Sequence, residues 1–153
     1  MRVWRICRVE HAAFDGEGGK TVSGRWHHRG LPVIYTANSL ALAALELFVH
    51  LPPGMDLRRF VAIPVDIPKR LKVTHLDVSK LPLRWREPRR LESMRDIGMK
   101  WLRDGRTAVL AVPSAVIPVE HNYLLNPRHP HFRRIRVGAP QPFEFDSRMW
   151  KSE

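Results

Sequence analysis

The order of apolar and polar residues predicts a chain built from several strands and two longer helices. Residues 3–8 alternate in the two-residue period of a strand, and a longer strand is expected at 60–67. Further strands are expected at 73–76 and 107–112, and two short ones near Ile135 and at 143–145. The 13 prolines are dispersed, which favours short strands and loops over a helical bundle. The expected class is α+β, with mixed, mostly antiparallel sheets and few helices.

A hairpin is predicted from the segments 23–27 and 33–37, joined by residues 28–32. In that register Arg25 lies opposite Tyr35 on one sheet face, with Cβ atoms about 5 Å apart. The glycine-rich segment 11–19 before it is expected to be a mobile loop.

Two helices follow from the periodic apolar positions. The first starts at a cap, Asn38 or Ser39, runs to about Leu51 and is stopped by Pro52-Pro53-Gly54. The second covers residues 92–102 and ends at Asp104-Gly105.

Glu46 lies inside the most apolar of these helices. Its neighbours three and four positions away are Leu42, Ala43, Val49 and His50, so no polar stripe connects it to water. An unpaired buried carboxylate costs several kcal/mol, by order of magnitude. Two interpretations are open for Glu46, a buried salt bridge to one of the many arginines or the acid of a functional site.

Other polar side chains occur at places where ligands bind or where turns are capped. Ser114 follows the apolar strand 107–112, and the Gly-x-Ser-x-Gly pattern of a nucleophile elbow is absent. Asn122 and Asn126 lie in the polar segment after it, where turn capping is the ordinary alternative. His129-x-His131 is a weak metal motif without a third ligand at a telling spacing, so no metal is expected.

Charge and composition narrow the class of protein. Lys and Arg number 26 against 15 Asp and Glu, a net charge of +11, which calls for an acidic partner such as nucleic acid, a phosphate-bearing small molecule or an acidic protein. The 153 residues suit one domain spanning 1–153. The lone cysteine and the absence of a leader pattern in the first residues predict a cytoplasmic protein. No membrane crossing is expected, because Glu46 interrupts the longest apolar run.

Together these segments resemble the RES domain family, which is named for its Arg, Glu and Ser. The resemblance is carried by Gly24-Arg25-Trp26, Tyr35, Ala44-Leu45-Glu46, Val112-Pro113-Ser114 and the run 122–127, and it extends from Val3-Trp4-Arg5-Ile6 to about Ile135. The resemblance implies an ADP-ribosyltransferase-like fold and site residues Arg25, Tyr35, Glu46 and Ser114.

The same resemblance implies a function. Family members are toxins of bacterial toxin-antitoxin pairs that attack NAD, passing ADP-ribose to water, phosphate or a protein, and an Xre-type helix-turn-helix antitoxin neutralises them. DNA contact is then expected only through the antitoxin, and a homodimer is left open.

The residues fit NAD cleavage on chemical grounds as well. A fixed carboxylate at Glu46 would stabilise an oxocarbenium-like sugar, and Arg25 would hold pyrophosphate or ribose. Tyr35 would stack on nicotinamide, Ser114 would donate a hydrogen bond to the ligand, and Asn122 and Asn126 complete the expected NAD-binding set. The rival interpretation is a basic nucleic-acid-binding or nucleolytic protein without NAD chemistry.

Overall fold

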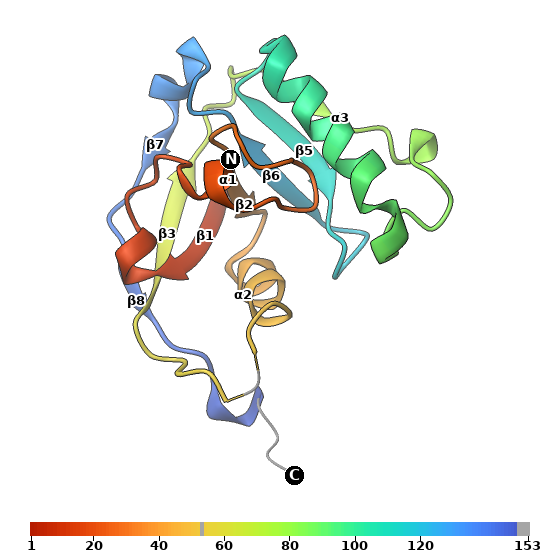
Figure 1. Ribbon diagram of the computed structural model, residues 1–153. Helices are drawn as coiled ribbons and strands as arrows, with labels where there is room; N and C mark the ends of the chain where they lie inside the picture. The colour runs from red at the N-terminus through yellow and green to blue at the C-terminus, as the bar shows by residue number, and fades with distance from the viewer. Residues whose placement is uncertain (53, 150–153) are drawn as a thin grey trace.

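Residues 1–52 and 54–149 are described by a computed structural model of the chain, and they form a curled eight-stranded sheet (Figure 1). The strand order is β4-β5-β6-β2-β1-β3-β7, with β8 also paired to β3. The strands are β1 (Arg2–Arg8), β2 (Ile34–Ala37), β3 (Phe60–Asp66), β4 (Val73–His75), β5 (Val109–Pro113), β6 (His121–Leu125), β7 (Arg136–Val137) and β8 (Gln141–Phe143). In this part of the chain β4 and β5 are parallel and all other pairs are antiparallel, which confirms the predicted class.

The helices are α1 (Gly18–Thr21), α2 (Leu40–Phe48) and α3 (Leu91–Asp104), with single-turn 3₁₀ segments between strands. Ser39 caps α2 by accepting a hydrogen bond from the Leu42 N–H, and Gly105 ends α3 in the left-handed conformation at φ 57°. Both long helices were predicted close to these bounds. Pro53 of the predicted stop lies outside the described residues.

None of the helices among residues 1–52 and 54–149 has the combined length and apolar character that a bilayer crossing requires.

The predicted hairpin is wrong. Residues 23–27 form no strand, and β2 pairs instead with β1 and β6. Trp26 and the adjacent His27 are both buried, so the segment lacks the alternation of buried and exposed side chains that marks a half-buried strand. The predicted loop 11–19 in turn contains the start of α1 at Gly18.

Strand β6 was missed and the tail strands were misplaced. Its sequence His121-Asn-Tyr-Leu-Leu looked like part of a polar segment, yet β6 lies between β2 and β5 in the sheet. The short strands expected near Ile135 and at 143–145 are β7 and β8, shifted by one or two residues. Pairing partners far away in the sequence, which local patterns do not show, decide these positions.

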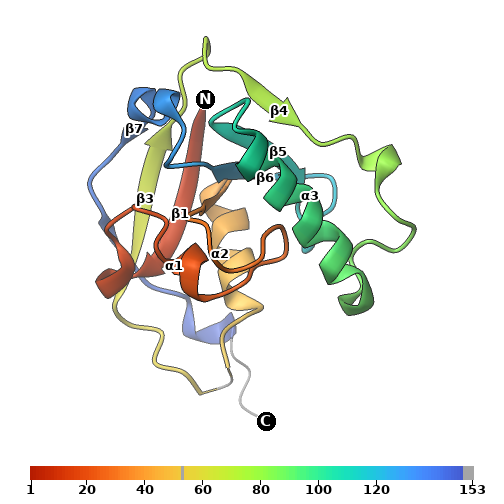
Figure 2. The ribbon, with the colours of Figure 1, turned by 45° about the horizontal axis from the view of Figure 1, so that its top comes forward.

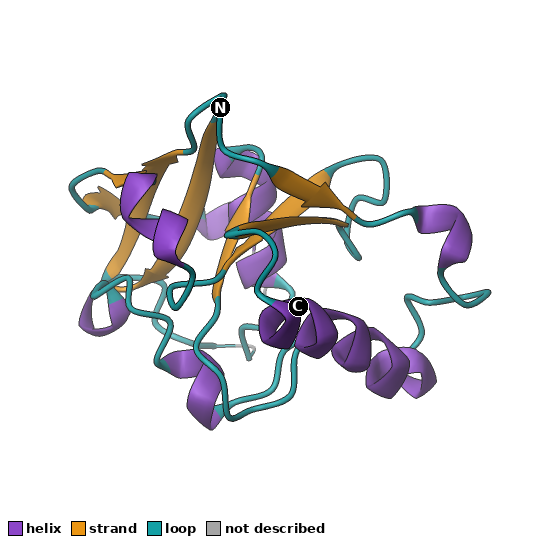
Figure 3. Ribbon diagram, turned by 90° about the horizontal axis from the view of Figure 1, so that it is seen from above, coloured by secondary structure: helices purple, strands orange, loops and turns teal. Residues whose placement is uncertain are grey.

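One face of the β2, β5 and β6 region supports the site. Helix α3 and Trp26 pack on it against Leu110, Val112 and Leu124. Helix α2 packs beside it against β1, β2 and β3, around Ala37. Figures 1 and 2 show α2 and α3 well separated over the sheet, with the loop before β2 between them, and Figure 3 shows the curl of the strands.

Candidate functional site

Glu46 is the centre of the candidate site. It lies in the last turns of α2 and is half-buried. Its Oε1 atom accepts two short hydrogen bonds, from Ser114 Oγ at 2.6 Å and from Asn122 Nδ2 at 2.6 Å. No ion pair within 4 Å and no hydrogen bond to Oε2 is found for Glu46 in residues 1–52 and 54–149. The carboxylate of Glu46 is therefore held by two dipoles, the Ser114 hydroxyl and the Asn122 amide. The buried salt bridge to an arginine, one of the two interpretations from the sequence, is not formed among the described residues.

Ser114 is placed by the end of β5. The residue is fully buried, and its backbone N–H donates to the Glu120 carbonyl. Its Oγ atom accepts hydrogen bonds from the N–H groups of Val116 and Ile117 while it donates to Glu46. The hydroxyl proton is thus directed at Glu46, which differs from the expectation that it would be offered to a ligand.

Asn122 reaches Glu46 from the neighbouring strand. In the register of β6, Asn122 lies between Val112 of β5 and Ala37 of β2. Its side chain is buried, and Oδ1 has no hydrogen-bond partner among the described atoms. Its amide orients Glu46, a role that could not be predicted because β6 was not recognised as a strand.

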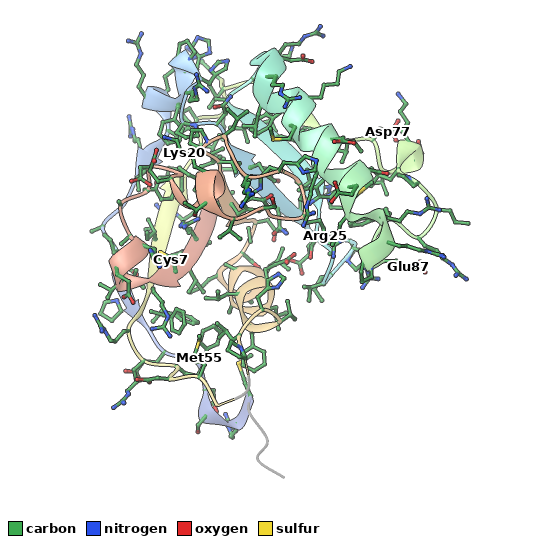
Figure 4. All side chains as sticks on the ribbon, in the orientation of Figure 1. Cys7, Lys20, Arg25, Met55, Asp77 and Glu87 are labelled. Carbon is green, nitrogen blue, oxygen red and sulfur yellow. The ribbon has the colours of Figure 1, made fainter. Side chains whose placement is uncertain are left out.

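Arg25 lies near enough to Glu46 for the two charges to interact. Burial lowers the pKa of the Arg25 guanidinium, and the negative charge of Glu46 acts in the opposite direction. The two side chains therefore attract each other, although no ion pair within 4 Å joins them among the described residues. The Nη1 atom of Arg25 donates to the Arg86 carbonyl at 3.2 Å, and Arg86 Nε donates to the Ala115 carbonyl. Figure 4 labels Arg25 beside α3 and Glu87 on the same side of the molecule. The segment around Arg86 therefore forms one margin of the site.

A tight turn over residues 24–27, closed by the Gly24 N–H donating to the His27 carbonyl, packs against Tyr35 and places Arg25 near it. The Tyr35 hydroxyl accepts from the Trp26 N–H at 3.1 Å and lies 2.8 Å from His27 Nδ1. Because His27 Nδ1 also accepts from the Gly24 N–H, it carries no proton of its own, and Tyr35 donates to it. Arg25 and Tyr35 are brought together as expected, but through this turn and not across a hairpin.

Gly24 has no room for a side chain. A Cβ atom there would lie 2.6 Å from the Tyr35 hydroxyl oxygen and 2.9 Å from His27 Nδ1. The Gly24 carbonyl accepts from Arg95 Nε of α3 at 3.0 Å. The turn is therefore clamped between β2 and α3, and its shape fixes where Arg25 points.

The two rings that meet at this turn, Tyr35 of β2 and His27, have shifted pKa values. Burial raises the pKa of the Tyr35 phenol, so the hydroxyl keeps its proton. Burial also lowers the pKa of His27, and the nearby Gly19 and Val22 carbonyl groups offset this only in part. His27 is therefore neutral at pH 7, as its acceptor role requires.

Two sequence candidates lie away from Glu46. Asn126 follows the opposite end of β6 from Asn122, and its Oδ1 accepts from the Arg128 N–H. His129 Nδ1 likewise accepts from the His131 N–H and caps a 3₁₀ turn (Pro130–Arg134). Both are turn caps. No group of three or more His, Cys, Asp or Glu side chains suited to a metal ion occurs in the described residues.

The arrangement places a held carboxylate, a guanidinium and a protonated phenol within one region of the sheet face. A carboxylate fixed by two dipoles stabilises positive charge that develops beside it without first having to reorganise. A partly buried guanidinium binds phosphate or carboxylate oxygens. The site can therefore bind an anionic ligand and stabilise a cationic transition state. His27 and Arg86, which complete it, were not singled out from the sequence, because their roles depend on contacts between distant segments.

Comparison with known proteins shows similarity to RES domain proteins and to toxins along nearly the whole chain. Residues 2–146 match the sequence model described as RES domain. A Toxin Res from Photorhabdus laumondii is 35% identical over 156 residues, covering 100% of this chain and 99% of the relative. A Prs ADP-ribosylating toxin from Sphingobium sp. is 35% identical over 155 residues, covering 95% and 94%. A Toxin Res from Pseudomonas putida is 36% identical over 157 residues, covering 98% and 100%.

A solved structure shares the fold. The crystal structure of the M. tuberculosis MbcT-MbcA toxin-antitoxin complex contains a chain that superposes with a TM-score of 0.72 at 14% identity. The match covers 94% of this chain and 84% of that one. At this identity the similarity shows a common fold.

Proposed function

Since the chain belongs to the RES domain family, we propose that it is the toxin of a toxin-antitoxin pair and that it consumes NAD by cleaving the nicotinamide-ribose bond. Relatives that match along nearly their whole length are named as toxins, one of them as an ADP-ribosylating toxin, and this supports the proposal.

The observation that carries the proposal is the carboxylate of Glu46 held by Ser114 and Asn122. In the reaction the bond between nicotinamide nitrogen and ribose C1′ breaks, its electron pair leaves with nicotinamide, and positive charge appears on the sugar. Glu46 stabilises that charge, and its two hydrogen bonds keep it in position. A nucleophile then bonds to C1′. Water gives ADP-ribose, phosphate gives an ADP-ribose phosphate ester, and a protein side chain becomes ADP-ribosylated.

Arg25 and Tyr35 act on the substrate in different ways. Arg25 binds the pyrophosphate or a ribose oxygen through charge-assisted hydrogen bonds, each contributing about 1.5–3 kcal/mol. Tyr35 presents the ring face for nicotinamide while its hydroxyl holds the turn. Asn126 has no part in this mechanism, because it lies at the other end of β6.

The proposed partner is an Xre-type helix-turn-helix antitoxin that covers the site. The similarity to a chain from a toxin-antitoxin complex supports an antitoxin partner of some kind. The margin formed by Arg25 and Arg86 gives such a partner a positive surface to approach.

The experiment is NAD consumption by the purified chain, followed as nicotinamide release. Mass spectrometry of the products with and without phosphate distinguishes hydrolysis from phosphorolysis. The Glu46→Gln variant keeps the shape and loses the charge, so turnover should fall about a hundredfold or more. Glu144→Gln, at an exposed position, is the control and should retain turnover. Equal turnover in the two variants would remove Glu46 from the mechanism.

A further inference from the structure

Cationic residues gather at the end of the sheet opposite the candidate site. Three segments, 69–72, 103–106 and 128–136, carry nine Lys and Arg residues against one carboxylate, Asp104. We call this surface the basic end. All nine of these cationic residues are exposed. They represent most of the +11 net charge of the chain, although they are far apart in the sequence.

The sheet topology brings the three segments together. Residues 69–72 lead from β3 to β4, and residues 103–106 end α3 and lead towards β5. Strands β4 and β5 are parallel, with Val73 paired to Val109. Residues 128–136 follow β6, whose last residue, Leu125, also pairs with Val109. Buried Leu71 and Ile135 join the same core cluster as Val109. The three segments therefore share one edge of the molecule, seen at the top of Figure 1.

The cations of the basic end form no close ion pairs in the described part of the chain, although Arg136, which pairs in register with Asp66, adds to the positive charge around that carboxylate. None of the nine forms an ion pair within 4 Å or a side-chain hydrogen bond with the described residues. Elsewhere pairing is common, as in Arg2 with Asp66, Arg58 with Asp56 and Arg148 with Asp146. Because like charges repel in the folded state, an unpaired group of this size costs stability unless a polyanion neutralises it.

The basic end also contains a hollow of about 320 Å³. Arg103 and Arg128 lie at its margin, and Leu31, Leu102 and Pro130 supply apolar walls. It adjoins a second, open hollow that shares Pro32 and Arg128 with it. Asp15 and Glu17 line the second hollow beside Lys20, so it is the first hollow, with Arg103 and Arg128 at its margin, that can take one unit of an anionic chain.

We propose that the basic end binds the phosphate backbone of nucleic acid. Phosphate binding needs distributed cations and little apolar area. An acidic protein partner would be expected to meet an apolar, aromatic-rich centre. At the basic end Met1 and Val137 are the exposed large apolar side chains among the described residues, and they are only 44% and 42% exposed. The surface therefore lacks the anchor that a protein interface requires.

This contact is independent of the NAD site. Ser114 follows the end of β5 and Arg106 precedes its start, so the strand separates the two regions by roughly 13 Å or more. It also differs from the expectation that DNA is contacted only through an antitoxin. The sequence shows the cations as scattered runs, whereas the fold places them on one surface.

The test is fluorescence anisotropy of the whole chain with labelled 20-nucleotide duplex DNA, single-stranded DNA and RNA at 50 and 200 mM salt. The affinity for at least one probe should fall about a hundredfold or more over this range, as expected when about four or more phosphates are neutralised. The quadruple variant Lys69→Glu, Arg70→Glu, Arg133→Glu, Arg134→Glu should bind that probe at least about tenfold more weakly at 50 mM.

A matched control changes the net charge equally elsewhere. Arg29→Glu, Arg58→Glu, Lys80→Glu, Arg148→Glu alters four exposed cations outside the basic end and should keep most of the affinity. Both variants should retain NAD turnover, so failure of this proposal is distinguishable from failure of the proposed enzyme. Equal affinities of the two variants, salt-independent binding, or binding to phosphatidylserine vesicles without binding to nucleic acid would overturn it.

Discussion

Ser114 Oγ lies 2.6 Å from Glu46 Oε1, although 68 residues separate them in the chain. The same hydroxyl oxygen accepts from the Val116 and Ile117 N–H groups, so its proton has a single direction left. Ser114 therefore acts here on the glutamate. It is a positioning residue for Glu46, with no free donor to offer the substrate.

Replacing Ser114 with Ala should lower kcat for NAD cleavage with little change in KM. A hydrogen bond from a hydroxyl to a carboxylate is worth about 1.5–3 kcal/mol, which corresponds to roughly ten- to a hundredfold in rate if Glu46 loses its position. Steady-state kinetics checks this, with Ser79→Ala at an exposed site as the control. A rise in KM at unchanged kcat would mean that Ser114 binds substrate directly.

Tyr35→Phe separates two roles of the phenol. Phe keeps the ring for stacking but loses the hydroxyl that joins the Trp26 N–H to His27 Nδ1. If the hydroxyl holds the turn that carries Arg25, the KM for NAD should rise about tenfold, and stability should fall by about 1–3 kcal/mol because partners are left unsatisfied. Kinetics and denaturant unfolding measure both effects.

The chain offers a matched control in its second tyrosine. Tyr123→Phe removes a hydroxyl from β6 on the sheet face opposite Asn122 and should leave the KM unchanged. If Tyr35→Phe behaves like Tyr123→Phe, stacking alone would explain Tyr35.

Much of the fold could be predicted because its signals are local. The cap at Ser39 and the glycine at 105 mark real helix ends, and the alternation in residues 3–8 marks a real strand. The strand prediction for residues 23–27 was wrong because the burial of two consecutive side chains, Trp26 and His27, depends on contacts with distant segments that the local pattern does not show. Strand β6 was missed because it begins with polar residues, of which Asn122 faces the site, and because its partners lie far away in the sequence.

In the candidate site, too, local features could be predicted and contacts between distant segments could not. Glu46 could be found from the sequence because a charge in an apolar helix is a local anomaly. Its hydrogen-bond donors could not be identified, because Ser114 and Asn122 reach it across 68 and 76 residues. Arg25 was placed near Tyr35 by an incorrect hairpin, and the true contact depends on Gly24 and on α3.

Gly98 provides a test of how tightly the turn is clamped. A Cβ atom on Gly98 would overlap the Trp26 carbonyl oxygen of the turn. Because Trp26 and α3 pack at backbone distance, Gly98→Ala should destabilise the fold by about 3 kcal/mol or more, beyond ordinary overpacking. Gly18→Ala is the control, since nothing lies within 4 Å of a Cβ there. Thermal unfolding should separate the two variants clearly, and equal midpoints would contradict the close packing of α3 on the turn.

His27 should make the fold sensitive to mild acid. Burial holds the pKa of His27 in the folded state below the ordinary histidine value of 6.5. Between that lowered pKa and about 6.5, the unfolded chain therefore binds more protons than the folded one. The free energy of unfolding should therefore fall as the pH drops below about 6.5 and should be insensitive to His27 above it. Arg95 and His28 add to the same shift, because both place positive charge near the ring.

Two measurements check the histidine prediction. An NMR titration of the ring should give a midpoint for His27 below 6.5. Protonation makes Nδ1 a donor, so it should break the hydrogen bond from the Gly24 N–H and turn the Tyr35 hydroxyl from donor to acceptor. In His27→Gln, whose amide oxygen can still accept both hydrogen bonds, the loss of stability between pH 6.5 and 5 should be smaller than in the wild type. His50→Gln, at an exposed position, should keep the wild-type slope. Identical slopes in all three proteins would show that His27 does not carry the acid sensitivity, and the neutral acceptor role assigned to its ring would then be wrong.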